Sequence, residues 1–416
     1  MKQRRFAGAV VFIFLLTSMC APQPDSTDIN LELQATDYSA AEIPVSANVQ
    51  LPAGFRRVSP DEIVVTLGSD DGAYADIPGQ IVATDDGGHQ LWWILPETGQ
   101  TNPARWTATL IRSREQAAPA FHWENTPAVH LDLLLNQKRV FRYSYEMDDQ
   151  FEEGETLTAL NKAFYHIFDL QGADVITNGP KEGLWSHHRG IMIGWRDVGF
   201  QGEELSFWGM EDLTVQKHIE FLREVAGPVL GQTRALIHWN DSTGTTIIEE
   251  EREATIYRQS PPAILMLDFT STLRASDGPV MLDGNAEHGG VQYRAHNDVA
   301  DEAPGAEQPT YYFHRDNIDP HEDYNLPWVG MSYGLRNNTY SVLDMDHPDN
   351  PDSTIWSAYR DYGRFGPFFR TDLDANETLT IHYRFWISED SMPDRDVLAS
   401  KYAAYVNPPE VSVLAP

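Results

Sequence analysis

Short apolar runs alternate with turn-forming residues along the N-terminal third of the chain. Residues 62–67 (EIVVTL) precede the turn-rich residues 68–72, and residues 91–95 (LWWIL) follow the turn-rich residues 85–88. Short strands separated by regular turn signals are typical of a β-sandwich. We therefore expect residues 33–118 to form an N-terminal β-sandwich domain.

Longer alternating runs follow. Residues 246–258 and 264–274 contain neither Gly nor Pro, and residues 379–387 (LTIHYRFWI) alternate between two faces. Period-two patterning over such lengths predicts large antiparallel sheets with one face buried. The sequence thus indicates an all-β protein, with a large antiparallel β super-sandwich over residues 119–391 and a C-terminal helix and tail over residues 392–416.

The first twenty residues have the pattern of an export signal. Basic residues near the start precede an apolar run at residues 7–16, which suits a signal peptide but is too short to span a bilayer. Cys20 stands where a bacterial lipoprotein carries its lipidated cysteine, so lipidation and simple cleavage nearby both remain open. We expect a signal peptide over residues 1–20, a linker over residues 21–32, and a periplasmic or extracellular protein without a membrane-spanning segment.

The charge balance excludes two classes of partner. Asp and Glu number 62 against 30 Lys and Arg, which gives a net charge of -32. Removing the signal peptide takes away three basic residues, so 27 minus 62 leaves -35. Nucleic acids and anionic membrane surfaces need a basic face. The scarcity of Lys favours a salt-adapted, halophilic or marine source, although an acidic surface that serves solubility is the alternative.

The strongest candidate for chemistry is the sequence SHHRG at residues 186–190, which precedes an apolar run. If this segment is a strand, His187 and Arg189 share one face, and His188 and Gly190 share the other. Glycine leaves room for a ligand or for a closely packed backbone, so His188 is the favoured cleft residue. The alternative is a structural His–Arg cluster at the end of a strand.

Two further segments carry polar groups beside apolar ones. Residues 290–296 alternate, and their polar face carries Gln292, Arg294 and His296, which offer donors and acceptors for sugar hydroxyls. A solvated outer face is the alternative. Residues 345–366 are dense in Asp, His, Arg and aromatic residues, as functional loops often are, although Asp and Asn also build turns.

Several familiar catalytic and binding motifs are absent or lack the secondary structure that they require. Residues 330–334 match G-x-S-x-G, but the chain continues as a strand where a nucleophile elbow needs a helix. Neither a P-loop, nor H-E-x-x-H, nor G-x-G-x-x-G occurs. We therefore expect no cofactor and no metal. A His-centred metal site would require His187 or His188 to meet His347 and a carboxylate.

Taken together, several segments resemble one bacterial family, the "methane oxygenase PmoA-like" family, a domain of unknown function. The matching segments, spread over about residues 33–410, are VFRY at 140–143, FYHIFD at 164–169, HHRG at 187–190, FWG at 207–209, GGVQYRA at 289–295, PW at 327–328, MDHPDNP at 345–351 and RDYGRFG at 360–366. Relatives often carry His-Pro before the double His, where this chain has Trp185-Ser186.

The resemblance implies a β-rich exported protein of bacterial carbohydrate utilisation. Its main domain would be similar to galactose mutarotase, by analogy alone. The family name does not describe an activity that we expect for this chain. A membrane subunit of methane monooxygenase needs several membrane-spanning helices.

On this basis we expect a carbohydrate ligand and His-assisted acid/base chemistry. His187 or His188 would transfer protons, since His titrates near neutral pH, with Asp361 as a partner. The expected substrate-binding residues are Arg189, Trp208, Gln292, Arg294, His347 and Arg360. Hydrolysis, elimination and epimerisation all remain open, and a non-catalytic carbohydrate-binding protein is the alternative. One shared pocket would bring His187 or His188 close to Arg294 and His347.

The acidic composition predicts a salt-dependent stability. Self-repulsion should weaken as the screening length falls from roughly 30 Å at about 0.01 M salt to roughly 3 Å at about 1 M. The melting temperature should therefore rise across this range. A flat or falling melting temperature would contradict salt adaptation.

Overall fold

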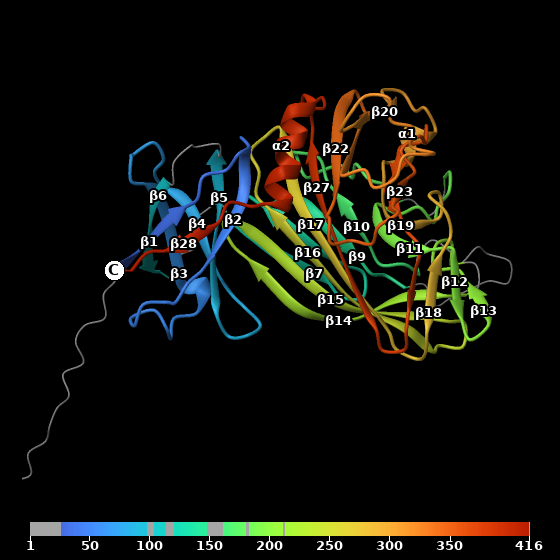
Figure 1. Ribbon diagram of the computed structural model, residues 1–416, viewed down its shortest axis with the longest axis horizontal. Coiled ribbons are helices and arrows are strands. Elements are labelled where there is room, and N and C mark those ends of the chain that lie inside the picture. The colour runs from blue at the N-terminus through green and yellow to red at the C-terminus, as the bar shows by residue number, and fades with distance from the viewer. Residues whose placement is uncertain are drawn as a thin grey trace, which may run out of the picture.

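The computed structural model describes residues 26–97, 104–113, 120–147, 161–179, 183–210 and 213–415. Regular structure in these residues is mostly β-strand, and the two α-helices described there are α1 (Asn297–Ala300) and α2 (Arg395–Val406). Two β-rich units lie side by side in Figure 1, the N-terminal one at the left. The expected all-β fold is confirmed, whereas the expected signal peptide and Cys20 lie outside the described residues.

The N-terminal unit is one seven-stranded antiparallel sheet around its own apolar core. Its end strands β2 and β28 contact each other, so the sheet curls round that core. In sheet order its strands are β2 (Ala41–Asn48), β5 (His89–Glu97), β4 (Ile77–Ala83), β3 (Ile63–Ser69), β6 (Ala104–Arg112), β1 (Ser26–Leu33) and β28 (Val411–Val413).

Two boundaries differ from the sequence-based expectation. The segment expected as a linker contains β1, whose alternating residues Ile29 and Leu31 enter the core. The expected C-terminal tail contains β28, which pairs with β1 through Leu31 and Val413. The two ends of the described chain are therefore neighbouring strands of one sheet.

The main unit is a sandwich of two large antiparallel sheets. The seven-stranded sheet has the order β24 (Arg364–Phe365), β19 (Gly289–Arg294), β11 (Ile191–Trp195), β10 (Phe164–Ile167), β9 (Lys138–Ser144), β8 (His130–Leu135) and β7 (Phe121–Thr126). The eight-stranded sheet has the order β14 (Val215–Ala226), β15 (Leu230–Asn240), β16 (Thr246–Tyr257), β17 (Ala263–Ala275), β27 (Thr378–Ser388), β22 (Asn338–Asp346), β21 (Trp328–Leu335) and β20 (Glu307–Phe313).

Two smaller sheets complete this unit. They are β13 (Glu203–Leu205), β12 (Asp197–Phe200), β18 (Val280–Asp283) and β26 (Thr371–Leu373), and the pair β23 (Ile355–Trp356) and β25 (Pro367–Phe368). The three long runs read from the sequence form β16, β17 and β27, as expected. Their alternating apolar residues, such as Leu267 and Phe269 of β17, enter the core between the two large sheets. Burying one such side chain contributes about 1.5–3 kcal/mol.

The two units are joined through an apolar contact that includes α2. Val82 and Trp92 of the N-terminal sheet share a cluster with Leu230 and Tyr257 of the main unit, and with Leu398 of α2. The Trp92 and Tyr257 ring centroids lie 5.7 Å apart.

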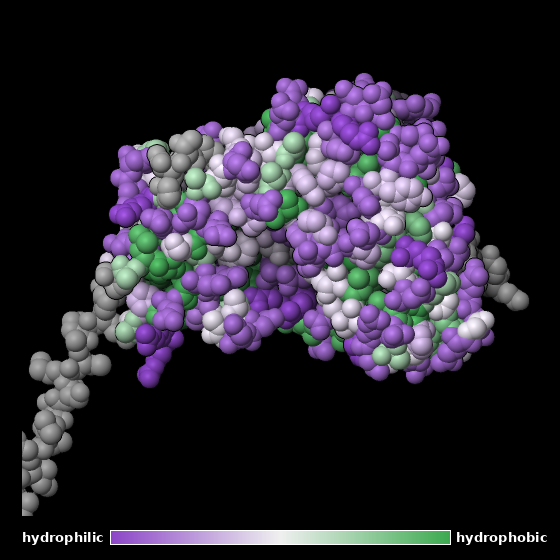
Figure 2. Space-filling view, in the orientation of Figure 1, coloured by the Kyte–Doolittle hydropathy of each residue, from purple (hydrophilic) through white to green (hydrophobic). Residues whose placement is uncertain are grey.

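Hydrophilic residues cover most of the face shown in Figure 2.

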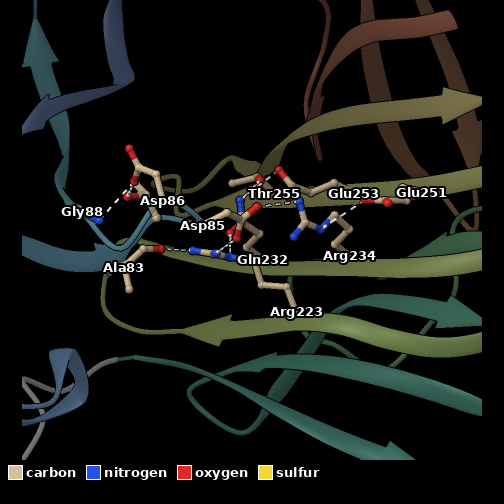
Figure 3. A network of polar contacts seen from close by, with 11 residues as sticks. Ala83, Asp85, Asp86, Gly88, Arg223, Gln232, Arg234, Glu251, Glu253 and Thr255 are labelled. Carbon is tan, nitrogen blue, oxygen red and sulfur yellow. Dashed lines mark hydrogen bonds and ion pairs between the residues drawn. The ribbon is translucent and has the colours of Figure 1, made fainter. Parts of the chain in front are cut away.

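Polar contacts across the junction differ in burial. Gln80, 6% exposed, accepts hydrogen bonds from the backbone N–H groups of Val229 (3.0 Å) and Leu230 (2.9 Å). Nearby, Asp85 reaches across from the N-terminal unit to Arg223 (3.0 Å) and Arg234 (2.9 Å), as Figure 3 shows. Asp85 is 62% exposed, and exposed ion pairs contribute little. We infer that Gln80 contributes more to the stability of the junction than Asp85 does.

Replacing Gln80 tests this ranking. Gln80→Leu would leave two buried N–H groups without an acceptor, at a cost of about 1–3 kcal/mol. Denaturant unfolding should show that loss, with a smaller loss for the control Asp85→Asn. A larger loss for Asp85→Asn would reverse the ranking.

Candidate functional site

The outer face of the seven-stranded sheet, turned away from the sandwich core, is buried along β24, β19, β11 and β10. On β19, Val291 and Tyr293 enter the core between the sheets. Gln292 and Arg294 point to the opposite face, yet both are 0% exposed. The alternation read from the sequence is thus confirmed, whereas the alternative of a solvated outer face is wrong, because loops cover it.

Glycines allow the covering backbone, which includes the short strand β25, to lie directly on β11 and β19. A Cβ at Gly194 of β11 would stand 2.2 Å from the carbonyl oxygen of Phe207. A Cβ at Gly290 of β19, where φ is +79°, would stand 1.9 Å from that of Pro367. The space left by glycine is therefore filled by backbone from residues 206–209 and 366–368.

The SHHRG segment is not a strand, contrary to our expectation. β11 begins at Ile191, and residues before it form a turn in which the N–H of His188 donates to the carbonyl of Trp185 (2.9 Å). Gly190 has φ +34°, and a Cβ there would clash with the carbonyl oxygen of Tyr165 at 1.9 Å. The strand alternation therefore does not extend to His187 and His188.

His188 is 4% exposed and lies among aromatic rings. Its ring centroid lies 5.3 Å from that of Trp208, 6.1 Å from that of Tyr362 and 4.4 Å from that of His187. In the described part of the chain, neither ring nitrogen of His188 has a hydrogen-bond partner. This imidazole has both polar atoms available.

Two arginines lie on adjacent strands beside it. Arg294 of β19 stands opposite Arg364 of β24 in the strand register, and both are 0% exposed. Arg364 donates through Nη1 to Oε1 of Gln292 (2.7 Å) and through Nε to the Tyr362 hydroxyl (3.2 Å). Arg294 donates through Nη1 to the carbonyls of Ala295 (2.8 Å) and Tyr362.

Two more cations border this region. The ammonium of Lys162 donates to the carbonyl of Trp208 and lies 5.4 Å from the Trp208 ring centroid. Arg189, 1% exposed, donates to the carbonyl of Gly179. We call the whole set the outer-face cluster. Its members are Lys162, His187, His188, Arg189, Trp208, Gln292, Arg294, Tyr362 and Arg364.

Burial and positive neighbours keep both imidazoles neutral. Burial, then Lys162, lowers the pKa of His187 to about 3. Burial, then Arg364, holds the pKa of His188 well below its ordinary value. Burial also lowers the pKa of Arg294 to about 10, which still leaves it a cation at neutral pH. A neutral histidine beside cations can accept a hydrogen bond, while its lowered pKa weakens its affinity for a proton.

Two expected site residues lie outside the cluster. His347 has its ring near His382 (5.7 Å) and near Tyr405 of α2 (5.2 Å). Asp361 is exposed, and its side chain has no hydrogen bond or ion pair in the described ranges. One pocket holding His188, Arg294 and His347 is thus a wrong expectation. The His-centred metal alternative loses the convergence with His347 that it required.

Arg360 lies at the border of the cluster. It pairs with Glu287, and its guanidinium carbon lies 5.9 Å from the Tyr362 ring centroid. The other expected residues, His187, His188, Arg189, Trp208, Gln292 and Arg294, come together in the cluster itself. The segments 187–189, 292–294 and 345–366 therefore meet in the cluster. The last of them contributes only residues from its second half, Tyr362 and Arg364.

Sequence reasoning missed four residues here. Lys162 is one of only six lysines in the chain, and its burial to 1% sets it apart. Tyr362 and Arg364 stand out in the sequence only as members of the RDYGRFG segment. Trp185 is 52% exposed, has φ +53° and lies 6.2 Å from the His187 ring, measured between centroids. An aromatic residue held in the left-handed region is uncommon, but the sequence alone carries no sign of it.

The fold and site define a β-sandwich protein with a buried cationic cluster on one sheet. The chain belongs to the family described as "Family of unknown function (DUF6807)", whose model matches residues 130–403 and so includes the whole cluster. No curated protein matches the chain. Among the residues that the structure describes, no helix has the length and apolar character needed to cross a membrane.

The solved structures that match the chain include one distant match. It bears the description "Putative kojibiose phosphorylase from human microbiome" and has 12% identity and a TM-score of 0.30. The alignment covers 64% of this chain but only 32% of that one. A TM-score this low supports no argument about shared fold or activity.

The neutral histidines predict acid sensitivity. A His whose folded pKa is depressed binds its proton mainly after unfolding, so its stabilising contribution holds above pH 6.5 and is lost as the pH falls toward 3. His188→Gln should therefore make the free energy of unfolding depend less steeply on pH between about 6 and 4, by up to about one proton. Chemical denaturation at several pH values measures this slope, and an unchanged slope would mean that His188 binds its proton equally well in the folded and the unfolded chain.

Proposed function

We propose that the chain is an exported carbohydrate-processing protein and that the outer-face cluster is its site. The observation that carries the proposal is the buried, neutral His188 between the rings of Trp208 and Tyr362, with both nitrogens unpartnered in the described residues. Aromatic faces pack against the apolar faces of sugar rings, and an imidazole can take a proton from the ligand. Kinship with PmoA-like proteins also remains a proposal.

His188 is the proposed base. Burial and Arg364 hold the pKa of His188 well below its ordinary value, so the proposal requires that ligand binding raise this pKa. The Tyr362 hydroxyl accepts a hydrogen bond from Arg364 Nε, which leaves its own proton free for donation to a ligand. Together they supply an acceptor and a donor from two different loops. We assign no role to the exposed Asp361.

This arrangement favours proton abstraction over hydrolysis. Glycoside hydrolysis ordinarily uses two carboxylates that flank the scissile bond. In the described ranges, no carboxylate is among the hydrogen-bond partners of His188, Arg294 or Arg364. Elimination or epimerisation, which need a base rather than two carboxylates, are therefore the proposed reactions.

A non-catalytic carbohydrate-binding protein is the second candidate. The exposed Trp185 favours it, because an exposed ring beside His187 can stack on a sugar without any chemistry. The two candidates differ in what His188 does to a bound glycan. Binding alone would depend on Trp185 and Trp208 more than on a proton acceptor.

A glycan array followed by turnover assays tests the proposal. His188→Gln should lower kcat on an identified glycan about 10²–10⁴-fold while changing Kd far less. His122→Gln, at an exposed residue of β7 outside the cluster, is the matched control and should leave both constants unchanged. Parallel loss of turnover and binding would favour the binding protein, and the absence of any bound glycan would sink the proposal.

A further inference from the structure

The guanidinium groups of Arg294 and Arg364 are placed at an energetic cost. They face each other across adjacent strands, and like charges directly opposite in a sheet repel. Both are 0% exposed. Burying a charge is costly unless an opposite charge and hydrogen bonds compensate it. An arginine does not avoid this cost by losing its proton, because it stays charged in proteins.

The partners that these two arginines have are neutral. Arg364 donates to the Gln292 amide, to the Ser357 hydroxyl (3.3 Å) and to the Tyr362 hydroxyl. Arg294 donates to two backbone carbonyls. Nε and Nη2 of Arg294 and Nη2 of Arg364 have no partner in the described residues. A carboxylate is therefore missing from the surroundings that the described chain supplies.

Two other buried arginines, Arg252 and Arg384, are paired with carboxylates, whereas buried Arg189 donates to a backbone carbonyl in the described residues. Arg252 and Glu250 are both 0% exposed and paired, with Nε and Nη2 donating to the two carboxylate oxygens at 2.7 Å each. Arg384 uses the same Nε and Nη2 edge on Asp268, at 2.5 and 2.7 Å. Arg142, whose side chain is 22% exposed, does so on Asp132, at 2.6 and 2.9 Å.

Arg294 presents this same edge, Nε with Nη2, without a carboxylate. A planar carboxylate fits such an edge with two parallel hydrogen bonds. We infer that the ligand of the outer-face cluster carries a carboxylate, as a uronic-acid sugar does, and that Arg294 binds it side-on while Arg364 Nη2 adds a third donor. This inference rests on the proposed function and names its substrate class.

The neighbours of Arg294 fit such a ligand. A carboxylate on Arg294 would hold the attached ring near Tyr362, whose own ring centroid lies 4.9 Å from the guanidinium carbon. His188 is 6.1 Å from Tyr362, measured between ring centroids. The proton acceptor thus lies on the same side of the sheet as the carboxylate site. Gln292, bonded to Arg364, acts as a positioning residue.

The first experiment needs no variant. Isothermal titration of the full chain at about 0.15 M salt compares oligogalacturonate, its methyl ester, a neutral galactose oligomer and a sulfated galactose oligomer. A charge-assisted pair predicts that the free acid binds roughly 10- to 100-fold tighter than its ester. Equal binding of acid, ester and neutral oligomer would contradict the inference that the ligand carries a carboxylate. It would leave the proposed function standing. Preference for the sulfated oligomer would also contradict that inference.

The second experiment uses Arg294→Gln, with Arg274→Gln as control. Arg274 lies on β17, is 37% exposed and pairs with Glu249 outside the cluster. Arg294→Gln should raise the melting temperature without ligand, because it removes the repulsion from Arg364, and should abolish the preference for the acid. The control should do neither. If Arg294→Gln still prefers the acid, the assignment fails. If no sugar of either kind binds the wild-type chain, the proposed function fails as well.

Discussion

Burial of the outer face of the seven-stranded sheet along β19 and β11 is the constraint on which the candidate site depends. An antiparallel sheet commonly leaves one face to water, but here backbone of residues 206–209 and of β25 lies directly on β11 and β19. Gly194 and Gly290 permit that contact, since a Cβ at either would meet a carbonyl oxygen. Polar side chains on this face are therefore dehydrated, and dehydration lowers the pKa of His188 and makes the charge of Arg294 expensive.

The electrostatics of this molecule differ between surface and interior. The chain carries a net charge of -32, yet the cluster gathers buried cations without a carboxylate bonded to Arg294 or Arg364 in the described residues. A long-range acidic field does not neutralise them, because screening weakens charges beyond about 10 Å at 0.1 M salt. Local compensation is what matters, and elsewhere in the core the chain provides it through Glu250 and Asp268.

The parts of the fold that the sequence predicted well are those whose pattern is long. β16, β17 and β27 each repeat the two-residue period many times, and the alternation on β19 even separated Gln292 and Arg294 from the core residues correctly. Short or interrupted patterns failed. SHHRG reads as a strand only until the backbone of Gly190 turns to φ +34°, and β28 is three residues long. His347 could not be placed, since its contact with Tyr405 depends on how α2 docks.

The pairing of β28 with β1 ties the order of synthesis to the order of folding. Domains generally fold from the N-terminus as the chain emerges, but the first unit of this chain lacks one strand of its sheet until Val411–Val413 has been made. Until then β1 has a free edge, and free edges are templates for pairing with other chains. A folding intermediate that lacks β28 would therefore expose the edge of β1, and pairing with Val411–Val413 covers that edge in the finished protein.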